Sequence, residues 1–259
     1  MSTSIDTTDS EDAVSHPAMT LGAGSGRMLD FIQQLSLNER DAMKAMLGDQ
    51  VSSFFDSNNR LRRDQESSVE QFDLLAETLR NLTPHSDTIP ANGIAYRGSP
   101  AWVTADLLLK LQEEAHSRRD QPLDRMDHFL GCGGQVADAL SVSPELVEFV
   151  AEHVGPVSPT GIASYLYYDQ AGLGIRPHVD TEVFSVNLIL MLRHEYEAGS
   201  EPSATVVFPA RSEPEAYRLQ IGEVMIMHGS SVIHGRSLVQ QGEDIHLLTI
   251  GFNRIFPGN

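Results

Sequence analysis

The feature that most constrains this chain is a series of short β-type runs that begins at about residue 160. Eight runs follow one another up to residue 254, separated by turn residues and by no helical segment. They read GIASYLYY, PHVD, FSVNLILMLR, ATVVFP, AYRLQI, EVMIMH, SVIHGRSLV and IHLLTIGFN. Short strands at this density are typical of an antiparallel sandwich or barrel. We therefore predict a core of jelly-roll type.

The region from about residue 27 to residue 155 has the pattern of helices instead. Helix-start signals occur as a capping box at 36–39 and as Ser-Pro pairs at 99–100 and 143–144. Between the first two signals, apolar residues recur at helical spacing at Val69, Phe72, Leu75, Leu79 and Leu82. We predict four to six helices that pack outside the β core, and therefore an α+β fold.

The chain is expected to form one structured domain after a flexible tail. Residues 1–26 are rich in Ser, Thr, Asp and Gly, and their charged residues are all acidic. Such a segment buries too little apolar surface to offset the entropy lost on ordering. Residues 27–259 are assigned to a single domain, in which 27–155 form a helical support and 156–259 form the jelly-roll core.

The composition limits the partners of the protein. With 36 acidic against 18 basic residues, the net charge is −18, which repels nucleic-acid phosphates and anionic lipid. The sequence has no long apolar run and no signal-peptide pattern, and a single cysteine, Cys132, allows no internal disulfide. We expect a cytoplasmic protein that acts on a small molecule and binds neither nucleic acid nor a membrane. The sequence indicates no oligomeric state.

A histidine and an aspartate stand immediately before the longest apolar run. His178 and Asp180 are two residues apart, so on a strand both side chains point to the same face. A third candidate, His234, lies in the later run SVIHGRSLV. Two histidines and one carboxylate are typical of non-haem Fe(II) sites, which leave half of the coordination sphere to substrate and dioxygen. A His-x-Asp pattern alone is common, but its place in this strand series favours a metal site.

With these residues the sequence resembles the Fe(II)/2-oxoglutarate-dependent dioxygenases, in particular the prolyl-hydroxylase-like and phytanoyl-hydroxylase-like branches. The resemblance covers roughly residues 160–254. It rests on a tyrosine-bearing strand ahead of His178-x-Asp180, and on LQIGEVMIMHGSSVIHG, which is similar to the family's glycine, apolar strand, loop and His-Gly. It implies a cupin-like core, a double-stranded β-helix, in which His178, Asp180 and His234 are iron ligands and Tyr168 lines the cosubstrate pocket.

The resemblance also implies a reaction. Fe(II), 2-oxoglutarate as cosubstrate and dioxygen would together hydroxylate the substrate, and the oxo acid would be converted to succinate and carbon dioxide. The expected enzyme is therefore a dioxygenase that hydroxylates a small molecule, an amino-acid-like compound or a natural product.

The sequence departs from the family at the residue that binds the distal carboxylate of 2-oxoglutarate. The family usually has an Arg or Lys about ten residues after the second histidine ligand, where its side chain binds this carboxylate. Here the position is Ile245 or, with a shift of one residue, His246. A protonated His246 could bind a carboxylate. Arg236, Arg254 and Arg193 are the alternatives.

Two other classes of function remain open. The same three residues could hold another divalent metal for hydrolysis or isomerisation, or iron in an oxidase that uses no oxo acid. Oxygen consumption distinguishes an oxygenase from a hydrolase or isomerase. A barrel without turnover that serves as a sensor or scaffold is favoured by the missing arginine and disfavoured by the complete triad.

Other candidate residues are assigned structural roles. The stretch LGCGGQV (130–136) resembles a phosphate-binding loop, but it lacks the third glycine and follows no clear strand, so we predict a tight turn between helices. His228 competes with His234 as a ligand and is expected instead to line the pocket or cap a strand. His194 is expected at the surface.

Overall fold

The computed structural model describes residues 21–63, 66–120, 123–125 and 127–255. The chain divides into two units, Met1–Gln34 and Leu35–Asn259. The described part of the first unit is one helix, α1 (Leu21–Gln34). Residues 21–26 of the predicted tail therefore belong to this helix, and residues 1–20 of that tail lie outside the described residues.

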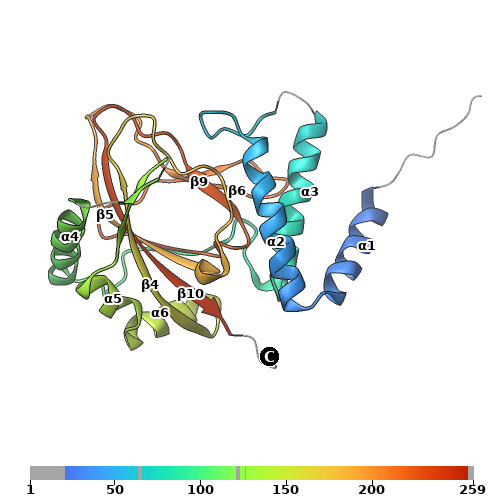
Figure 1. Cartoon of the computed structure of the whole chain (residues 1–259), viewed down its shortest axis with the longest axis horizontal. Helices are drawn as coiled ribbons and strands as arrows, with labels where there is room; N and C mark the ends of the chain where they lie inside the picture. Colours follow the sequence, from blue (N-terminus) through green and yellow to red (C-terminus); the bar gives the residue numbers. More distant parts are fainter. Residues whose placement is uncertain (1–20, 64–65, 121–122, 126, 256–259) are drawn as a thin grey trace, which may run out of the picture. The chain divides into compact units, whose positions relative to one another are not determined.

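Two antiparallel sheets form the core of the second unit (Figure 1). The larger has the order β1 (Ile94–Gly98), β8 (Val224–Met227), β5 (Val186–Glu195), β10 (Asp244–Arg254), β4 (Val157–Tyr168), β3 (Phe129–Cys132) and β2 (Leu123–Asp124). The smaller has the order β7 (Glu215–Tyr217), β6 (Thr205–Phe208) and β9 (Ile233–Arg236). Side chains of both sheets pack together between them, among them Ile189, Met225 and Val207. This is the predicted double-stranded β-helix.

Helices cover both sheets on their outer faces (Figure 1). Against the larger sheet pack α4 (Ala105–Arg119), α5 (Gln135–Ser141) and α6 (Pro144–Val154). Against the smaller sheet pack α2 (Leu37–Val51) and α3 (Glu66–Leu82), whose Val51, Phe72 and Leu79 belong to one buried cluster with Phe208 and Ile233. Three short 3-10 helices complete the unit: η1 (Ser52–Phe54), η2 (Ser86–Thr88) and η3 (Glu182–Phe184). None of the described helices is long and apolar enough to cross a membrane.

The apolar run after Asp180 is explained by the position of β5 in the middle of the larger sheet. Leu188 and Leu190 pack in the cluster that includes the outer helices, whereas Ile189 and Met191 pack in the cluster between the sheets. Because both faces of the strand are buried, the usual alternation of apolar and polar residues is lost.

Two of the three helix-start signals are confirmed. The capping box of Ser36 and Glu39 opens α2, and Ser143 caps α6 with Pro144 in its first turn. The helix predicted to begin at Ser99 begins instead at Ala105, with Thr104 as its cap. Pro100 lies in the preceding turn, where its carbonyl accepts a hydrogen bond from Val103 (3.1 Å), so the Ser-Pro signal marks a turn at this position.

The strand assignments differ from the expectation in two respects. PHVD forms no strand and contributes only an isolated bridge between His178 and His234. The region 27–155 contains, besides its helices, three strands that the sequence patterns did not indicate, β1, β2 and β3. β1 pairs with β8 and β3 pairs with β4, and these pairings extend the larger sheet on both sides.

The glycine-rich stretch 130–136 is not a turn between helices. It is the end of β3, a loop and the start of α5, where the N–H groups of Val136 and Ala137 donate to the carboxylate of Glu114 (2.8 and 3.0 Å). A Cβ at Gly134 would lie 2.5 Å from the carboxyl carbon of Glu114, so a larger residue there would displace this carboxylate. The chain's own carboxylate thus occupies the position that a phosphate takes in a phosphate-binding loop.

Candidate active site

The three predicted metal ligands meet between the two sheets. His178 precedes η3 and His234 lies on β9, and their backbone N–H groups donate to one another's carbonyls (2.8 and 2.9 Å). The backbone N–H of Asp180 donates to the carbonyl of Gly229 (2.9 Å). One ligand atom from each of the three side chains lies within 4.8 Å of the other two. In the described part of the chain, this is the one group of three or more such residues that could hold a metal ion.

Both histidines are oriented by a second hydrogen bond. Nδ1 of His178 lies 2.7 Å from the carbonyl oxygen of Arg176, and Nδ1 of His234 lies 3.0 Å from that of Val232. A carbonyl oxygen can only accept, so both Nδ1 atoms carry the proton. Nε2 is therefore the atom of each ring that binds a metal once it has lost its proton.

Asp180 is held between the two histidines. Its Oδ1 lies 3.3 Å from Nε2 of His178 and its Oδ2 lies 3.5 Å from Nε2 of His234. Asn187 donates Nδ2 to Oδ2 (2.9 Å), and a Cβ at Gly229 would lie 2.1 Å from the same oxygen. The amide of Asn187 thus holds the carboxylate, and glycine at position 229 leaves room for it.

The electrostatics of the triad suit a cation. Burial alone would raise the pKa of Asp180, but the charge of His234 and the hydrogen bond from His178 hold it well below its usual range. Burial would lower the pKa of His178, and the hydrogen bond to Asp180 raises it instead. The carboxylate is ionised, and a metal bound between these groups would displace the proton they share. Two imidazole nitrogens and one carboxylate oxygen fit a divalent transition metal.

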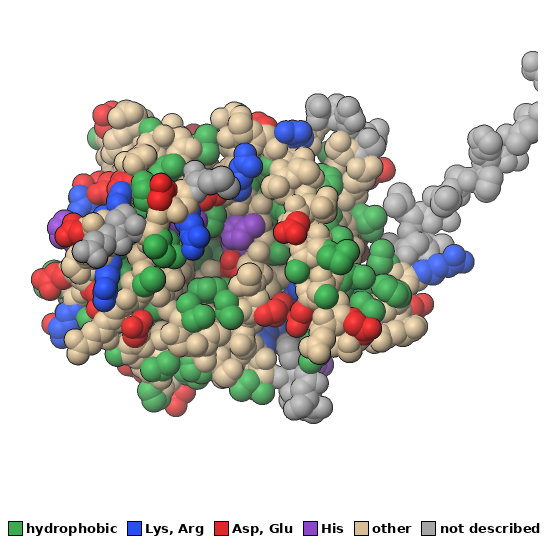
Figure 2. Space-filling model, in the orientation of Figure 1, with side chains coloured by type: hydrophobic (Ala, Val, Ile, Leu, Met, Phe, Trp, Pro, Cys, Tyr) green, Lys and Arg blue, Asp and Glu red, His purple; other side chains and the backbone are tan. Residues whose placement is uncertain are grey.

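The triad lines a cavity of about 290 Å³ in the core of the double-stranded β-helix. Both sheets contribute to its walls, with Leu166, Ile189, Leu247 and Thr249 from the larger and Thr205 and Gly235 from the smaller. The side chain of His178 is 31% exposed, so the cavity is reached from the surface. Figure 2 shows a histidine side chain in the middle of the visible face, with basic and acidic side chains close to it.

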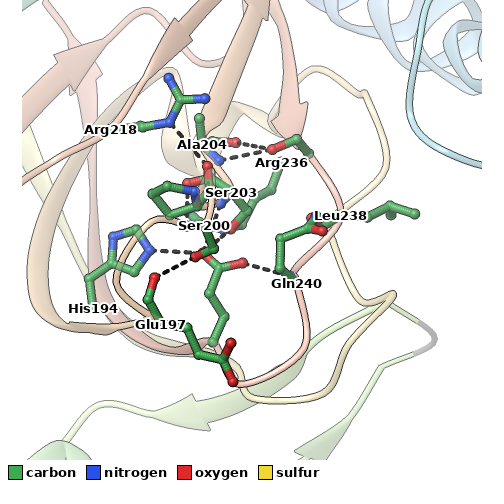
Figure 3. Close-up of polar contacts among 12 residues, drawn as sticks. His194, Glu197, Ser200, Ser203, Ala204, Arg218, Arg236, Leu238 and Gln240 are labelled. Atoms are coloured by element: carbon green, nitrogen blue, oxygen red, sulfur yellow. Dashed lines mark hydrogen bonds and ion pairs between the residues drawn. The ribbon is translucent and has the colours of Figure 1, made fainter.

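A buried arginine lies in the same cavity. Arg236 follows His234 by two residues on β9, and its side chain, like those of His234 and Tyr168, lines the cavity. Its guanidinium carbon lies 5.2 Å from the centre of the Tyr168 ring, and the residue is only 3% exposed. Nε and Nη2 donate to the hydroxyl (3.1 Å) and the carbonyl (3.4 Å) of Ser203 (Figure 3).

Arg236 has no anionic partner at ion-pair distance among the described residues, and its Nη1 has no hydrogen-bond partner among them. A buried cation without a counter-ion in contact is costly. The geometry therefore fits a carboxylate supplied by a ligand in the cavity, because a guanidinium binds such a group through two parallel hydrogen bonds.

The structure does not bring His246 to this cavity. On β10, Leu247 and Thr249 line the cavity, so the side chain of His246 points to the opposite face of the sheet. There its ring packs edge to face on Tyr167 (4.9 Å), and its Nε2 lies 3.2 Å from the carboxylate of Asp244.

Two further basic residues among the predicted alternatives, Arg254 and Arg193, also lie outside the cavity. Arg254, near the end of β10, donates to the hydroxyl of Thr88 (3.1 Å). Arg193 forms ion pairs with Glu195 and Asp244 at the end of β5 and the start of β10. His228 is buried after β8 and is not part of the triad.

Sequence reasoning missed three polar residues of the site. Besides Asn187, these are His128, which lines the cavity, and Asp127, whose Oδ1 lies 2.6 Å from Nδ1 of His128. The other oxygen of Asp127 accepts from the backbone N–H of Arg176 (2.9 Å). The carbonyl of Arg176 in turn orients the ring of His178. His128 directly precedes β3, so a predicted strand at this place would have indicated the direction of its side chain. β3, however, was not predicted.

Comparisons by sequence find no relatives, since no family model and no curated protein matches the chain. Solved structures match it by fold. The non-haem α-ketoglutarate-dependent epimerase SnoN from nogalamycin biosynthesis matches with a TM-score of 0.54 and 11% identity, over 75% of this chain and 92% of that chain. An oxidoreductase of the 2OG-Fe(II) oxygenase family from Burkholderia pseudomallei matches with a TM-score of 0.51 and 14% identity, over 76% and 93%.

A third match is HygX from Streptomyces hygroscopicus, solved with nickel, 2-oxoglutarate and hygromycin B bound. Its TM-score is 0.50 at 13% identity, over 66% of this chain and 85% of that chain. Similarity at such low identity concerns the fold. The chain is thus a double-stranded β-helix protein with a possible His-Asp-His metal site. Its fold is that of the Fe(II)/2-oxoglutarate oxygenases, which confirms the resemblance at the level of architecture.

Proposed function

We propose that this protein is an Fe(II)- and 2-oxoglutarate-dependent oxygenase that hydroxylates a small molecule. The observation that carries the proposal is a convergence of two features in one cavity. The first is a donor set of two histidines and one carboxylate, and the second is a buried arginine that no described carboxylate contacts. The donor set suits Fe(II), and the arginine suits the distal carboxylate of an oxo acid.

Each side chain receives a role from its position. His178, Asp180 and His234 hold the metal, and Arg236 binds the distal carboxylate of 2-oxoglutarate through its free N–H groups. Tyr168 lies against the guanidinium. Burial raises the pKa of the Tyr168 hydroxyl well above its usual range, so this hydroxyl stays protonated and can donate a hydrogen bond to the same carboxylate.

Bound Fe(II) would supply, together with 2-oxoglutarate and dioxygen, the oxidant that hydroxylates a C–H bond. The chain contributes binding and orientation. Its histidines present Nε2 because their Nδ1 protons are bound to backbone carbonyls, and Asn187 keeps the carboxylate of Asp180 in place. The apolar side chains of both sheets keep bulk water from the reacting atoms.

The size and charge of the protein favour a small-molecule substrate. A cavity of about 290 Å³ has to contain the cosubstrate and the reacting part of the substrate. HygX, which has this fold, was solved with hygromycin B bound, and SnoN is named an epimerase, so the fold serves more than one reaction. The net charge of −18 disfavours nucleic acid as a substrate.

The proposal is tested by anaerobic titration of the metal-free protein with Fe(II) and then with 2-oxoglutarate. We expect one Fe(II) per chain, followed by the weak visible charge-transfer band that chelation of an oxo acid produces. In Arg236→Gln the dissociation constant of 2-oxoglutarate should rise about 100-fold, since a charge-assisted pair is lost. Arg254→Gln, which changes a predicted alternative outside the cavity, should behave as the wild type.

Two results would favour the alternatives. If Fe(II) binds but no band develops, the protein uses another oxo acid or none, and oxygen consumption then separates an oxidase from a hydrolase or isomerase. If His178→Ala leaves the cellular phenotype of the protein intact, the barrel serves as a sensor or scaffold.

A further inference from the structure

A buried carboxylate lies one hydroxyl away from Arg236, between the loop that joins β5 to β6 and the loop that joins β9 to β10. Glu243, which precedes β10, has a side chain with 0% exposure. Its Oε1 accepts from Nε2 of His194 (2.9 Å) and from the backbone N–H (2.8 Å) and hydroxyl (2.9 Å) of Ser203. Its Oε2 accepts from the backbone N–H of Gln240 (2.6 Å). His194 is thus not a surface residue, because its side chain is 6% exposed and bound to Glu243.

The hydroxyl of Ser203 connects Glu243 to Arg236, and its direction is determined by its neighbours. A guanidinium can only donate and an ionised carboxylate can only accept. Burial would raise the pKa of Glu243, but the hydrogen bonds from His194, Gln240 and Ser203 lower it to about 2, so this carboxylate is ionised. Ser203 therefore accepts from Nε of Arg236 and donates its one proton to Glu243.

This arrangement leaves one edge of the guanidinium free. Nε and Nη2 of Arg236 are directed at Ser203, whereas Nη1 has no partner in the described part of the chain. A carboxylate in direct contact would occupy the groups that a ligand needs. Placed one hydroxyl away, Glu243 offsets the charge of the buried cation and does not compete for its free edge.

We propose that Ser203 and Glu243 are positioning residues for Arg236 and set the affinity of the cavity for an oxo acid with a distal carboxylate. This inference rests on the proposed function. It concerns the distal end of the cosubstrate alone, because Ser203 and Glu243 contact none of His178, Asp180 and His234 in the described structure.

The test compares two oxo acids on Ser203→Ala, loaded with Fe(II) and titrated anaerobically. One is 2-oxoglutarate, and the other is 2-oxopentanoate, which has the same chain length and lacks the distal carboxylate. We expect the dissociation constant of 2-oxoglutarate to rise about tenfold or more, because a hydrogen bond to a charged group is lost. The dissociation constants of 2-oxopentanoate and of Fe(II) should stay unchanged.

Matched variants separate positioning from general loosening. Ser200→Ala removes a hydroxyl of the same loop that donates only to the carbonyl of Glu197, and should leave both oxo acids unaffected. Ser203→Thr keeps the hydroxyl and should restore the affinity for 2-oxoglutarate. If Ser203→Ala folds poorly, Ser203→Cys keeps the shape of the side chain with weaker hydrogen bonds, and should show the same selective loss.

The inference is overturned if the Ser203 variants bind 2-oxoglutarate as tightly as the wild type, or if both oxo acids are weakened by the same factor. In either case the wild type still forms the charge-transfer band, and the proposed function stands. If the wild type forms no band with 2-oxoglutarate, the proposed function and this inference fail together.

Discussion

Asn187 is a polar residue in the apolar part of β5, and its contacts explain why it is there. It donates Nδ2 to Asp180, whereas its Oδ1 is buried without a hydrogen-bond partner in the described structure. An amide that binds one oxygen of a carboxylate leaves the other oxygen to the metal and fixes its direction. Asn187 therefore belongs to the candidate metal site although it is not itself a ligand.

We expect Asn187→Leu to weaken Fe(II) binding about 10–100-fold, which is typical for the loss of a residue that orients a ligand. The protein should stay folded, since leucine fills a similar volume in an apolar strand. Fe(II) titration in the absence of oxygen measures the effect. Asn253→Leu, at an exposed position of β10, is the control. Equal affinities of Asn187→Leu and the wild type would contradict the assignment.

At this scale, the His-x-Asp spacing, the order of the strands and the resemblance of the His-Gly pair predicted that His178, Asp180 and His234 meet, although PHVD itself forms no strand. The choice between Arg236 and His246 was beyond the sequence, because a shift of one residue moves a side chain to the other face of a strand. The pairing of β10 with β5 shifts its register between His246 and Leu247. The sequence does not show this shift, so the side chain that faces the cavity could not be determined by counting along the strand.

Among the elements, those with local signals or within the series of short β-type runs were predicted, and the isolated short strands were not. The capping box of α2 and the Ser-Pro start of α6 consist of residues that lie close together in the sequence. β1 and β3 are short, and each gains its hydrogen bonds from a strand that comes later in the chain. Ile94–Gly98 and Phe129–Cys132 stand among helical segments, so no series of neighbouring runs marked them as strands.

The start of α5 depends on one side chain of α4. We expect Glu114→Ala to lower the free energy of unfolding by about 2–3 kcal/mol, because two helix N–H groups and the hydroxyl of Tyr165 lose a charged acceptor. Urea denaturation measures the change. Fe(II) affinity should stay as in the wild type, since α5 packs outside the larger sheet.

The neighbouring residue provides the control for this experiment. Glu113 is exposed on the same helix, and Glu113→Ala should change the free energy of unfolding by less than about 0.5 kcal/mol. A similar loss in both variants would mean that the helix, and not the cap of α5, is affected.

For the whole molecule, burial of His228 makes folding sensitive to pH. Burial, followed by the charges of Arg254 and Arg80, lowers the pKa of His228 from 6.5 to about 4. The unfolded chain therefore binds a proton at this residue at a higher pH than the folded protein. The contribution of neutral His228 to the free energy of unfolding is fully present above pH 6.5 and is lost as the pH falls from there toward 4.

His228→Gln should remove this part of the pH dependence. The shift corresponds to about 3 kcal/mol, at about 1.4 kcal/mol per pKa unit, so the wild type should lose up to that much more stability than the variant between pH 7 and pH 4. Unfolding of the metal-free proteins at a series of pH values measures the difference. His116→Gln, at an exposed position, should follow the wild type. Parallel curves for His228→Gln and the wild type would contradict the buried, neutral state.

The placement of His234 and Arg236 on one four-residue strand has a consequence for the length of the molecule that binds. Two residues along a strand span about 6.6 Å, and pairing of β9 with β6 keeps that span constant. If one end of the oxo acid is bound at the metal and the other at the arginine, the strand fixes the distance between the two groups that bind it. An acid one methylene shorter or longer would reach either end but not both.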